Sequence, residues 1–107
     1  MRFPESEFDQ VRADAHAVMR EAIESGVWIV GGGFAGFHPS VVTGDGFTSD
    51  GPLAETTHHI GGFAVLQVES REAAIHWASR IAKACRCSQE MREIMSDPQQ
   101  EMWQGKL

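Results

Sequence analysis

Three consecutive glycines, Gly31 to Gly33, constrain the fold of this chain more than any other stretch. With Gly36 they complete the pattern G-x-G-x-x-G after the apolar segment 27–30, and Asp50 follows at about the 20-residue offset of a ribose-binding acid. Such a loop holds phosphates only where its glycines open a helix, because the helix supplies the free N–H groups. Pro39 and repeated glycines follow here, and they favour turns over a helix. The pattern therefore predicts strands joined by turns and argues against a dinucleotide site.

Length and charge narrow the class of protein. The 107 residues suffice for one domain, residues 1–107, with a single core. The formal net charge of −6, from 15 acidic and 9 basic residues, argues against direct binding to nucleic acid. No apolar run approaches the roughly 20 residues that cross a bilayer, and the N-terminus lacks the apolar segment of a signal peptide. We therefore expect a cytoplasmic protein that binds neither nucleic acid nor membrane.

The two cysteines, Cys85 and Cys87, are too few for a disulfide framework. We expect reduced thiols, because a structural zinc site on this pair would need two further ligands nearby.

Two amphipathic helices are predicted. The first begins at the N-cap Ser6 and ends at Gly26, and the second begins at the N-cap Ser70 and ends between residues 84 and 86. In each, apolar side chains recur every three or four residues and form one stripe. The stripes are Phe8, Val11, Ala15, Val18, Met19, Ala22 and Ile23 in the first helix, and Ala74, Trp77, Ala78, Ile81, Ala82 and Cys85 in the second.

Strands are predicted around the helices. Residues 27–30 and 61–68 read as core strands, and segments 41–43 and 47–49 flank a glycine-rich turn, which predicts a small hairpin that projects from the sheet. A last strand is predicted over roughly 89–95.

The order of these elements resembles a split β-α-β sandwich, with both helices on one face of a sheet. A complete unit would begin with a strand, yet only residues 1–3 precede the first helix, so this strand is short or absent. Its place at the sheet edge would be filled by a partner or by the tail. The sheet face away from the helices also needs cover, because apolar side chains there would otherwise meet water. We therefore expect a homodimer that pairs through its sheet faces.

One stretch carries a family resemblance. Residues 49–56, S-D-G-P-L-A-E-T, followed by I-G-G-F at 60–63, closely resemble the signature T-D-G-P-F-A-E-T-K-E…G-G-F of the DGPFAETKE branch of the YCII-related proteins. The likeness runs from roughly residue 11 to residue 95. Leu53 replaces the signature phenylalanine, His58 and His59 replace charged or amide residues, the hairpin is shortened, and the first strand is missing.

The resemblance implies a ferredoxin-like α+β protomer that pairs into a dimeric α/β barrel with one cleft per protomer. It implies that the glycines turn the chain out of a core strand beside the Asp50 loop. It also implies a catalytic pair of His16 and Asp50 in the cleft, transferring protons in a lyase, isomerase or dehydrohalogenase-type step on a small organic molecule without an organic cofactor. We expect the substrate to contact Gly33, His38, Pro52, Glu55 and His59.

Each of these residues also has a purely structural explanation. His16 would be an exposed helix histidine, Asp50 would accept backbone N–H bonds in a turn, and Glu55 would be a polar loop residue. His38 with His58 or His59 could instead join His16 or Asp50 in a metal site, although adjacent histidines on an extended segment point to opposite faces. Solvated loop histidines are the simpler expectation, and we expect no metal.

Two functions outside enzymology stay open. Some DGPFAETKE relatives are linked with alternative sigma factors, which implies a non-enzymatic ligand-binding or transcription-associated module. A purely structural dimer with a vestigial cleft is the third hypothesis.

Overall fold

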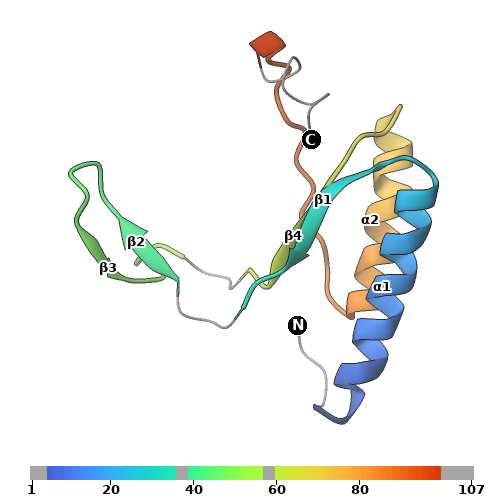
Figure 1. The fold of residues 1–107 in the computed structure, drawn as a ribbon, viewed down its shortest axis with the longest axis horizontal. Helices are drawn as coiled ribbons and strands as arrows, with labels where there is room; N and C mark the ends of the chain where they lie inside the picture. Colours follow the sequence, from blue (N-terminus) through green and yellow to red (C-terminus); the bar gives the residue numbers. More distant parts are fainter. Residues whose placement is uncertain (1–4, 36–38, 57–59, 100–107) are drawn as a thin grey trace.

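The computed structural model describes residues 5–35, 39–56 and 60–99, and Figure 1 shows their arrangement. The elements, in chain order, are η1 (Glu5–Glu7), α1 (Phe8–Glu24), β1 (Trp28–Gly33), β2 (Ser40–Val42), β3 (Thr48–Asp50), β4 (Gly62–Leu66) and α2 (Arg71–Cys85). Two helices and two small antiparallel sheets make an α+β protomer, as predicted, and the arrangement is consistent with a ferredoxin-like fold. Neither described helix is long and apolar enough to cross a membrane.

The helix ends follow the predicted signals with one exception. The Ser70 hydroxyl accepts a hydrogen bond from the Ala73 N–H (3.1 Å), and α2 ends at Arg86, whose φ of 58° is left-handed. The predicted cap at Ser6 is wrong, because Glu5–Glu7 form a 3-10 turn that continues into α1. Ser6 therefore lies inside a turn and not at the extended position from which a side chain caps a helix.

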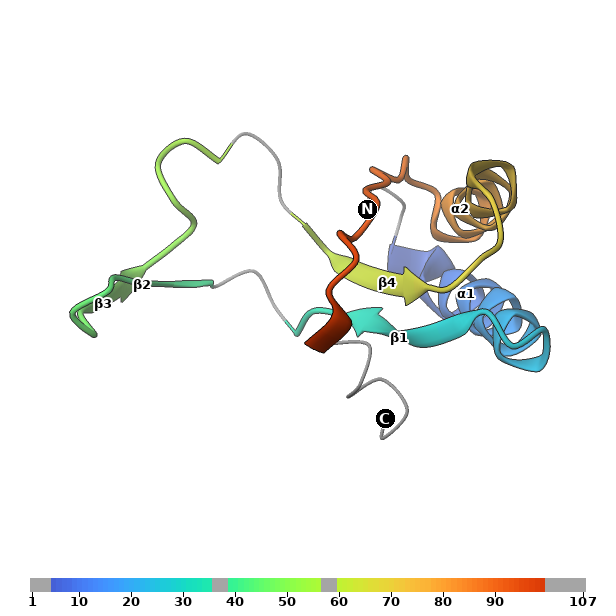
Figure 2. The same cartoon turned by 90° about the horizontal axis from the view of Figure 1, so that it is seen from above.

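The core lies between the two helices and one face of the β1–β4 sheet (Figure 2). It consists of Val18, Ala22, Trp77 and Ala84, with a rim of partly buried Val27, Trp28, Leu66, Val68 and Ile81. Two ion pairs link the helices at its border, Glu21 with Arg80 and Asp14 with Arg86 (2.9 Å). Hydrogen bonds, first from Gln10 and then from Arg86, lower the pKa of the exposed Asp14 carboxyl.

Glycines let β1 and β4 approach closely. A Cβ on Gly31 would lie 2.6 Å from the Phe63 carbonyl oxygen, and one on Gly62 would lie 2.6 Å from the Gly32 carbonyl oxygen. The glycine run is therefore part of the strand, and the expectation that it only turns the chain out of the strand is corrected. Glycine inside a strand marks such a close backbone approach.

The predicted hairpin is confirmed, and it projects from the sheet on the side away from the helices (Figures 1 and 2). We call residues 39–51 the arm. Its two strands contact mainly each other, and its base is closed by a hydrogen bond from the Gly51 N–H to the Pro39 carbonyl (2.7 Å). Because the turn and the base are both hydrogen-bonded, the arm is a preformed unit without a core of its own.

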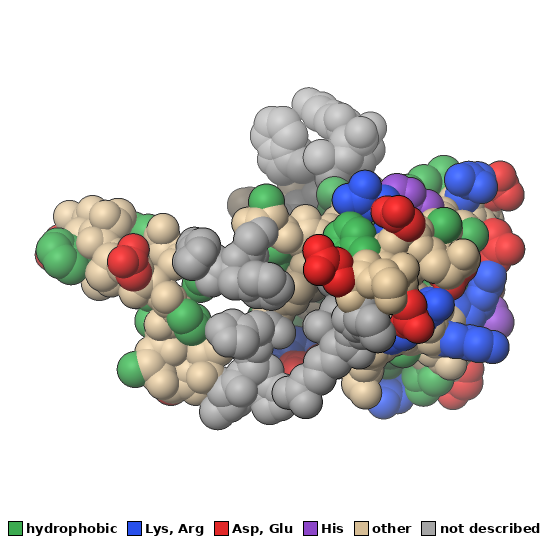
Figure 3. Space-filling view, turned by 90° about the horizontal axis from the view of Figure 1, so that it is seen from below, with side chains coloured by type: hydrophobic (Ala, Val, Ile, Leu, Met, Phe, Trp, Pro, Cys, Tyr) green, Lys and Arg blue, Asp and Glu red, His purple; other side chains and the backbone are tan. Residues whose placement is uncertain are grey.

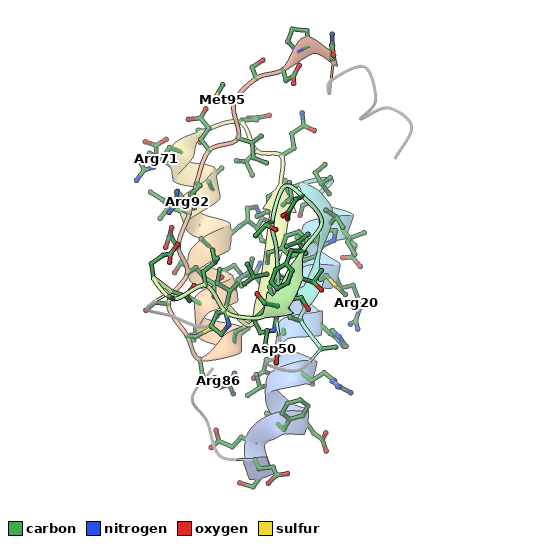
Figure 4. All side chains as sticks on the ribbon, turned by 90° about the vertical axis from the view of Figure 1, so that its left-hand side faces the viewer. Arg20, Asp50, Arg71, Arg86, Arg92 and Met95 are labelled. Carbon is green, nitrogen blue, oxygen red and sulfur yellow. The ribbon has the colours of Figure 1, made fainter. Side chains whose placement is uncertain are left out.

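The predicted strand over 89–95 is wrong. These residues follow α2 without regular structure, and Met95 is 87% exposed. Figure 4 shows the segment with Arg92 and Met95 along the side of β4 that faces away from β1. A strand needs a hydrogen-bonding neighbour, and none of the described strands pairs with this segment. The short first strand, predicted within residues 1–3, falls outside the described residues.

Candidate functional site

Asp50 ends β3 at the base of the arm, opposite Ser40 in the ladder. Its side chain is exposed, and its carboxylate has no hydrogen-bond or ion-pair partner among the described residues. A Cβ on the next residue, Gly51, would lie 2.9 Å from the Pro39 carbonyl oxygen, so this position needs glycine to close the base. The backbone therefore fixes Asp50 in place while its carboxylate stays free.

The alternative role considered for Asp50 was to accept backbone N–H bonds in a turn. In the structure Asp45, at the arm's tip, has this role. The Asp45 carboxylate accepts hydrogen bonds from the Thr43 hydroxyl and the Phe47 N–H (3.1 Å). These bonds, the Thr43 bond first, lower the pKa of the Asp45 carboxyl. Because the shift is downward, the carboxylate's support of the turn is complete above the unfolded-state pKa and is lost as the pH falls through the folded-state value. The arm's tip is thus closed at neutral pH.

His16 lies on an exposed face of α1, away from the buried Val18 and Ala22. Arg12 and Arg20 lie four residues before and after it, so the three side chains share one face of the helix. We call Arg12, His16 and Arg20 the basic row. Figure 4 shows Arg20 on the side of α1 that points away from α2.

Two acidic residues of α1 form ion pairs with arginines outside this row. Asp14 and Glu21 face the other way and pair with Arg86 and Arg80 of α2. Of the row itself, Arg12 lies over the Phe8 ring at 5.4 Å, and no ion pair of Arg20 occurs among the described residues. Arg12 and Arg20 therefore lie at the surface without an ion pair among the described residues, and Asp9 is an acidic residue that shares their face of the helix.

Within one chain the structure does not bring His16 and Asp50 together. Figures 1 and 2 show α1 and β3 at opposite ends of the molecule, with the β1–β4 sheet between them. Pro52 and Glu55 lie exposed in the loop after the arm, and Gly33 lies in β1 opposite Gly62. His38, His58 and His59 lie outside the described residues.

Three other kinds of candidate site were considered in the described part of the chain: a metal site, a concavity and the two cysteines. None includes a residue of the predicted catalytic or substrate-binding set. No three histidine, cysteine or acidic side chains there gather as metal ligands. One concavity of about 350 Å³ is lined by the consecutive residues Ile94 to Pro98, far along the chain from the predicted pair. Cys85 and Cys87 are free thiols, and burial, followed by the neighbouring Cys87, raises the pKa of Cys85.

An apolar surface on the sheet is the feature whose residues sequence reasoning did not name. Because Leu66 packs into the core, the alternation along β4 turns Phe63 outward, and Val30 and Phe34 share that side. Val30 is 49% and Phe63 52% exposed, and the Phe34 and Phe63 rings lie 5.9 Å apart. We call Val30, Phe34 and Phe63 the outward face. Alternation in 61–68 was the available signal, but it does not say which half faces the helices.

These features define a class of protein, an antiparallel α+β protomer with both helices on one sheet face and the other face open. The family model of the YCII-related domain matches residues 4–96. The chain therefore belongs to the YCII-related family. No curated protein and no solved structure matches it.

Proposed function

We propose that this protein is a homodimeric acid/base enzyme acting on a small organic molecule, with His16 and Asp50 as the proton-transferring pair and no organic cofactor. The free carboxylate of Asp50 carries the proposal. Its backbone is fixed at the arm's base, while Asp45 and not Asp50 stabilises the turn. A histidine beside a carboxylate acts as a general base near neutral pH, because the carboxylate orients the ring and stabilises its cation.

Two observations support the dimer. The outward face leaves apolar side chains in water, although monomers rarely expose contiguous apolar patches. The radius of gyration is 16.1 Å, against about 13 Å for a compact domain of this length. A second copy on the outward face would bury the patch and fill the space beside the arm.

The dimer predicts the effect of a charge on the outward face. Phe63→Asp is expected to convert the dimer to a monomer, because a buried unpaired carboxylate is strongly unfavourable. Light scattering coupled to gel filtration measures the mass. Ile75→Asp is the matched control, since Ile75 is 47% exposed on α2 and lies outside the outward face. A wild-type monomer, or two variants with the same mass, would contradict pairing through this face.

The catalytic pair predicts a coupling between its two members. Asp50→Asn is expected to make the ring nitrogens of His16 titrate at a lower pH, because the substitution removes the carboxylate that stabilises the imidazolium. NMR of ¹⁵N-labelled histidine follows the titration. Asp45→Asn is the control, since it removes an equal charge from the tip of the same arm and should shift the midpoint less.

An unchanged titration midpoint of His16 in the Asp50→Asn variant would contradict the proposed catalytic pair. The non-enzymatic functions would then be the preferred hypotheses. These are a ligand-binding module and a module associated with an alternative sigma factor. Each makes the exposed outward face a docking surface and leaves His16 without a catalytic role.

A further inference from the structure

We infer that the site is composite, and that in the dimer the arm of each protomer carries its Asp50 to the basic row of its partner. The inference rests on the proposed function and deepens it, because it assigns the two members of the pair to different chains. The occupant of the basic row is thus a second copy of this chain.

Within one chain, the sheet separates the two members of the pair. The β1–β4 sheet stands between α1 and β3, so Asp50 would reach its own His16 only by passing the sheet (Figure 1). The arm is closed at both ends, by the Gly51–Pro39 bond at its base and by the Thr43–Asp45–Phe47 bonds at its tip. These hydrogen bonds fix Asp50 at the base of the arm, on the far side of the sheet from α1 (Figure 1).

The arm also points in the direction in which a partner would lie. It leaves the sheet on the side away from the helices, which is also the side on which a second sheet would stack (Figure 2). Packed sheets lie about 10 Å apart, and a helix layer lies roughly as far again behind the second sheet. An arm that extends in this direction runs past the partner's sheet and toward the partner's helices.

The arm itself has an apolar surface. Val42 and Phe47 are both 65% exposed, and β2 and β3 contact mainly each other among the described elements. An isolated two-stranded hairpin is marginally stable in water. Contact with a partner would stabilise the arm and bury both side chains.

The arm and the basic row also differ in charge. The arm contains Asp45 and Asp50 and neither lysine nor arginine, while the basic row has two arginines on either side of His16 in a chain of net charge −6. Figure 3 shows acidic and hydrophobic side chains on the arm, and basic side chains interspersed with acidic ones over the helices. Complementary charges of this kind fix the register of an interface. They bring Asp50 toward His16 between Arg12 and Arg20.

Mixed dimers test the inference without knowledge of the substrate. An Asp50→Asn chain with ¹⁵N-labelled histidine is refolded with an unlabelled His16→Ala chain, and the mixed dimer is isolated through two different tags. If the site is composite, the labelled His16 meets the Asp50 of the other chain, and its titration midpoint returns to the wild-type value. If the site lies within one chain, the midpoint stays at that of the Asp50→Asn homodimer.

The reverse mixture gives the opposite outcome. A labelled wild-type chain paired with an unlabelled Asp50→Asn chain should show the lowered midpoint of the variant, although its own Asp50 is intact. The His16 midpoint could differ between the wild-type and Asp50→Asn homodimers and yet not recover in the mixed dimer. That result would overturn the composite site and keep the proposed pair. Identical midpoints in the two homodimers would overturn both.

Discussion

Trp77→Ala is expected to lower the free energy of unfolding by about 3–5 kcal/mol, the usual loss when a buried aromatic residue is truncated. Trp77 is 9% exposed and is the largest of the five buried apolar side chains in the described part of the chain. Arg80 lies 5.2 Å over its ring, and His76 meets its edge at 5.6 Å. The substitution therefore removes the largest buried side chain that α2 contributes to the core.

Urea unfolding at fixed protein concentration measures this loss, because the stability of a dimer depends on concentration. Ile75→Ala is the control, two positions earlier on the same helix and 47% exposed, and it should cost below about 1 kcal/mol. Similar losses for the two variants would show that the core is not centred on Trp77.

The helices, the hairpin and β4 were predictable because their signals are local. The Ser70 cap, the end of α2 near Arg86 and the turn at Asp45 each depend on a few adjacent residues. Apolar spacing also predicted buried residues of each helix, including Val18 and Trp77, but it wrongly placed Phe8 and Ile23 on the buried stripe, since both are exposed. The α+β class then follows from the order of the elements.

The errors concern properties that adjacent residues do not determine. The segment 89–95 has alternating side chains, but a strand forms only beside a hydrogen-bonding neighbour. Ser6 has a suitable side chain for a cap, yet the backbone around it is already helical. The role of Gly31 depends on the backbone of β4, about 30 residues later in the chain, which no local pattern reveals.

In the candidate site, too, local features were predictable and tertiary distances were not. Sequence reasoning weighed Asp50 as a turn residue, and the structure places it at the end of β3, beside the Gly51–Pro39 bond. The distance between Asp50 and His16 is a property of the tertiary fold, and within one protomer the fold separates them. The spacing of Arg12, His16 and Arg20 was visible in the sequence. The sequence does not show that this face of α1 and the arm lie at opposite ends of the molecule.

Gly31→Ala is expected to destabilise the protein by about 1–3 kcal/mol, the usual cost of forcing an extra methyl group into a packed site. Its Cβ would lie 2.6 Å from the Phe63 carbonyl oxygen and 2.9 Å from the Ala64 Cα. Both are backbone atoms of β4, so relief requires the two strands to move apart. The substitution therefore acts on the pairing between β1 and β4.

Gly33→Ala separates this steric effect from the general cost of replacing a strand glycine. Gly33 lies in the same strand on the same face, but its Cβ would meet only the Gly61 carbonyl oxygen at 3.7 Å, an ordinary contact. Alanine there should be neutral or slightly stabilising, because it restricts the unfolded chain. Urea unfolding compares the two variants, and amide exchange of Phe34, whose N–H donates to the Gly61 carbonyl, reports on the strand pairing. Equal stability of both variants would mean that β1 and β4 do not approach as closely as the glycines allow.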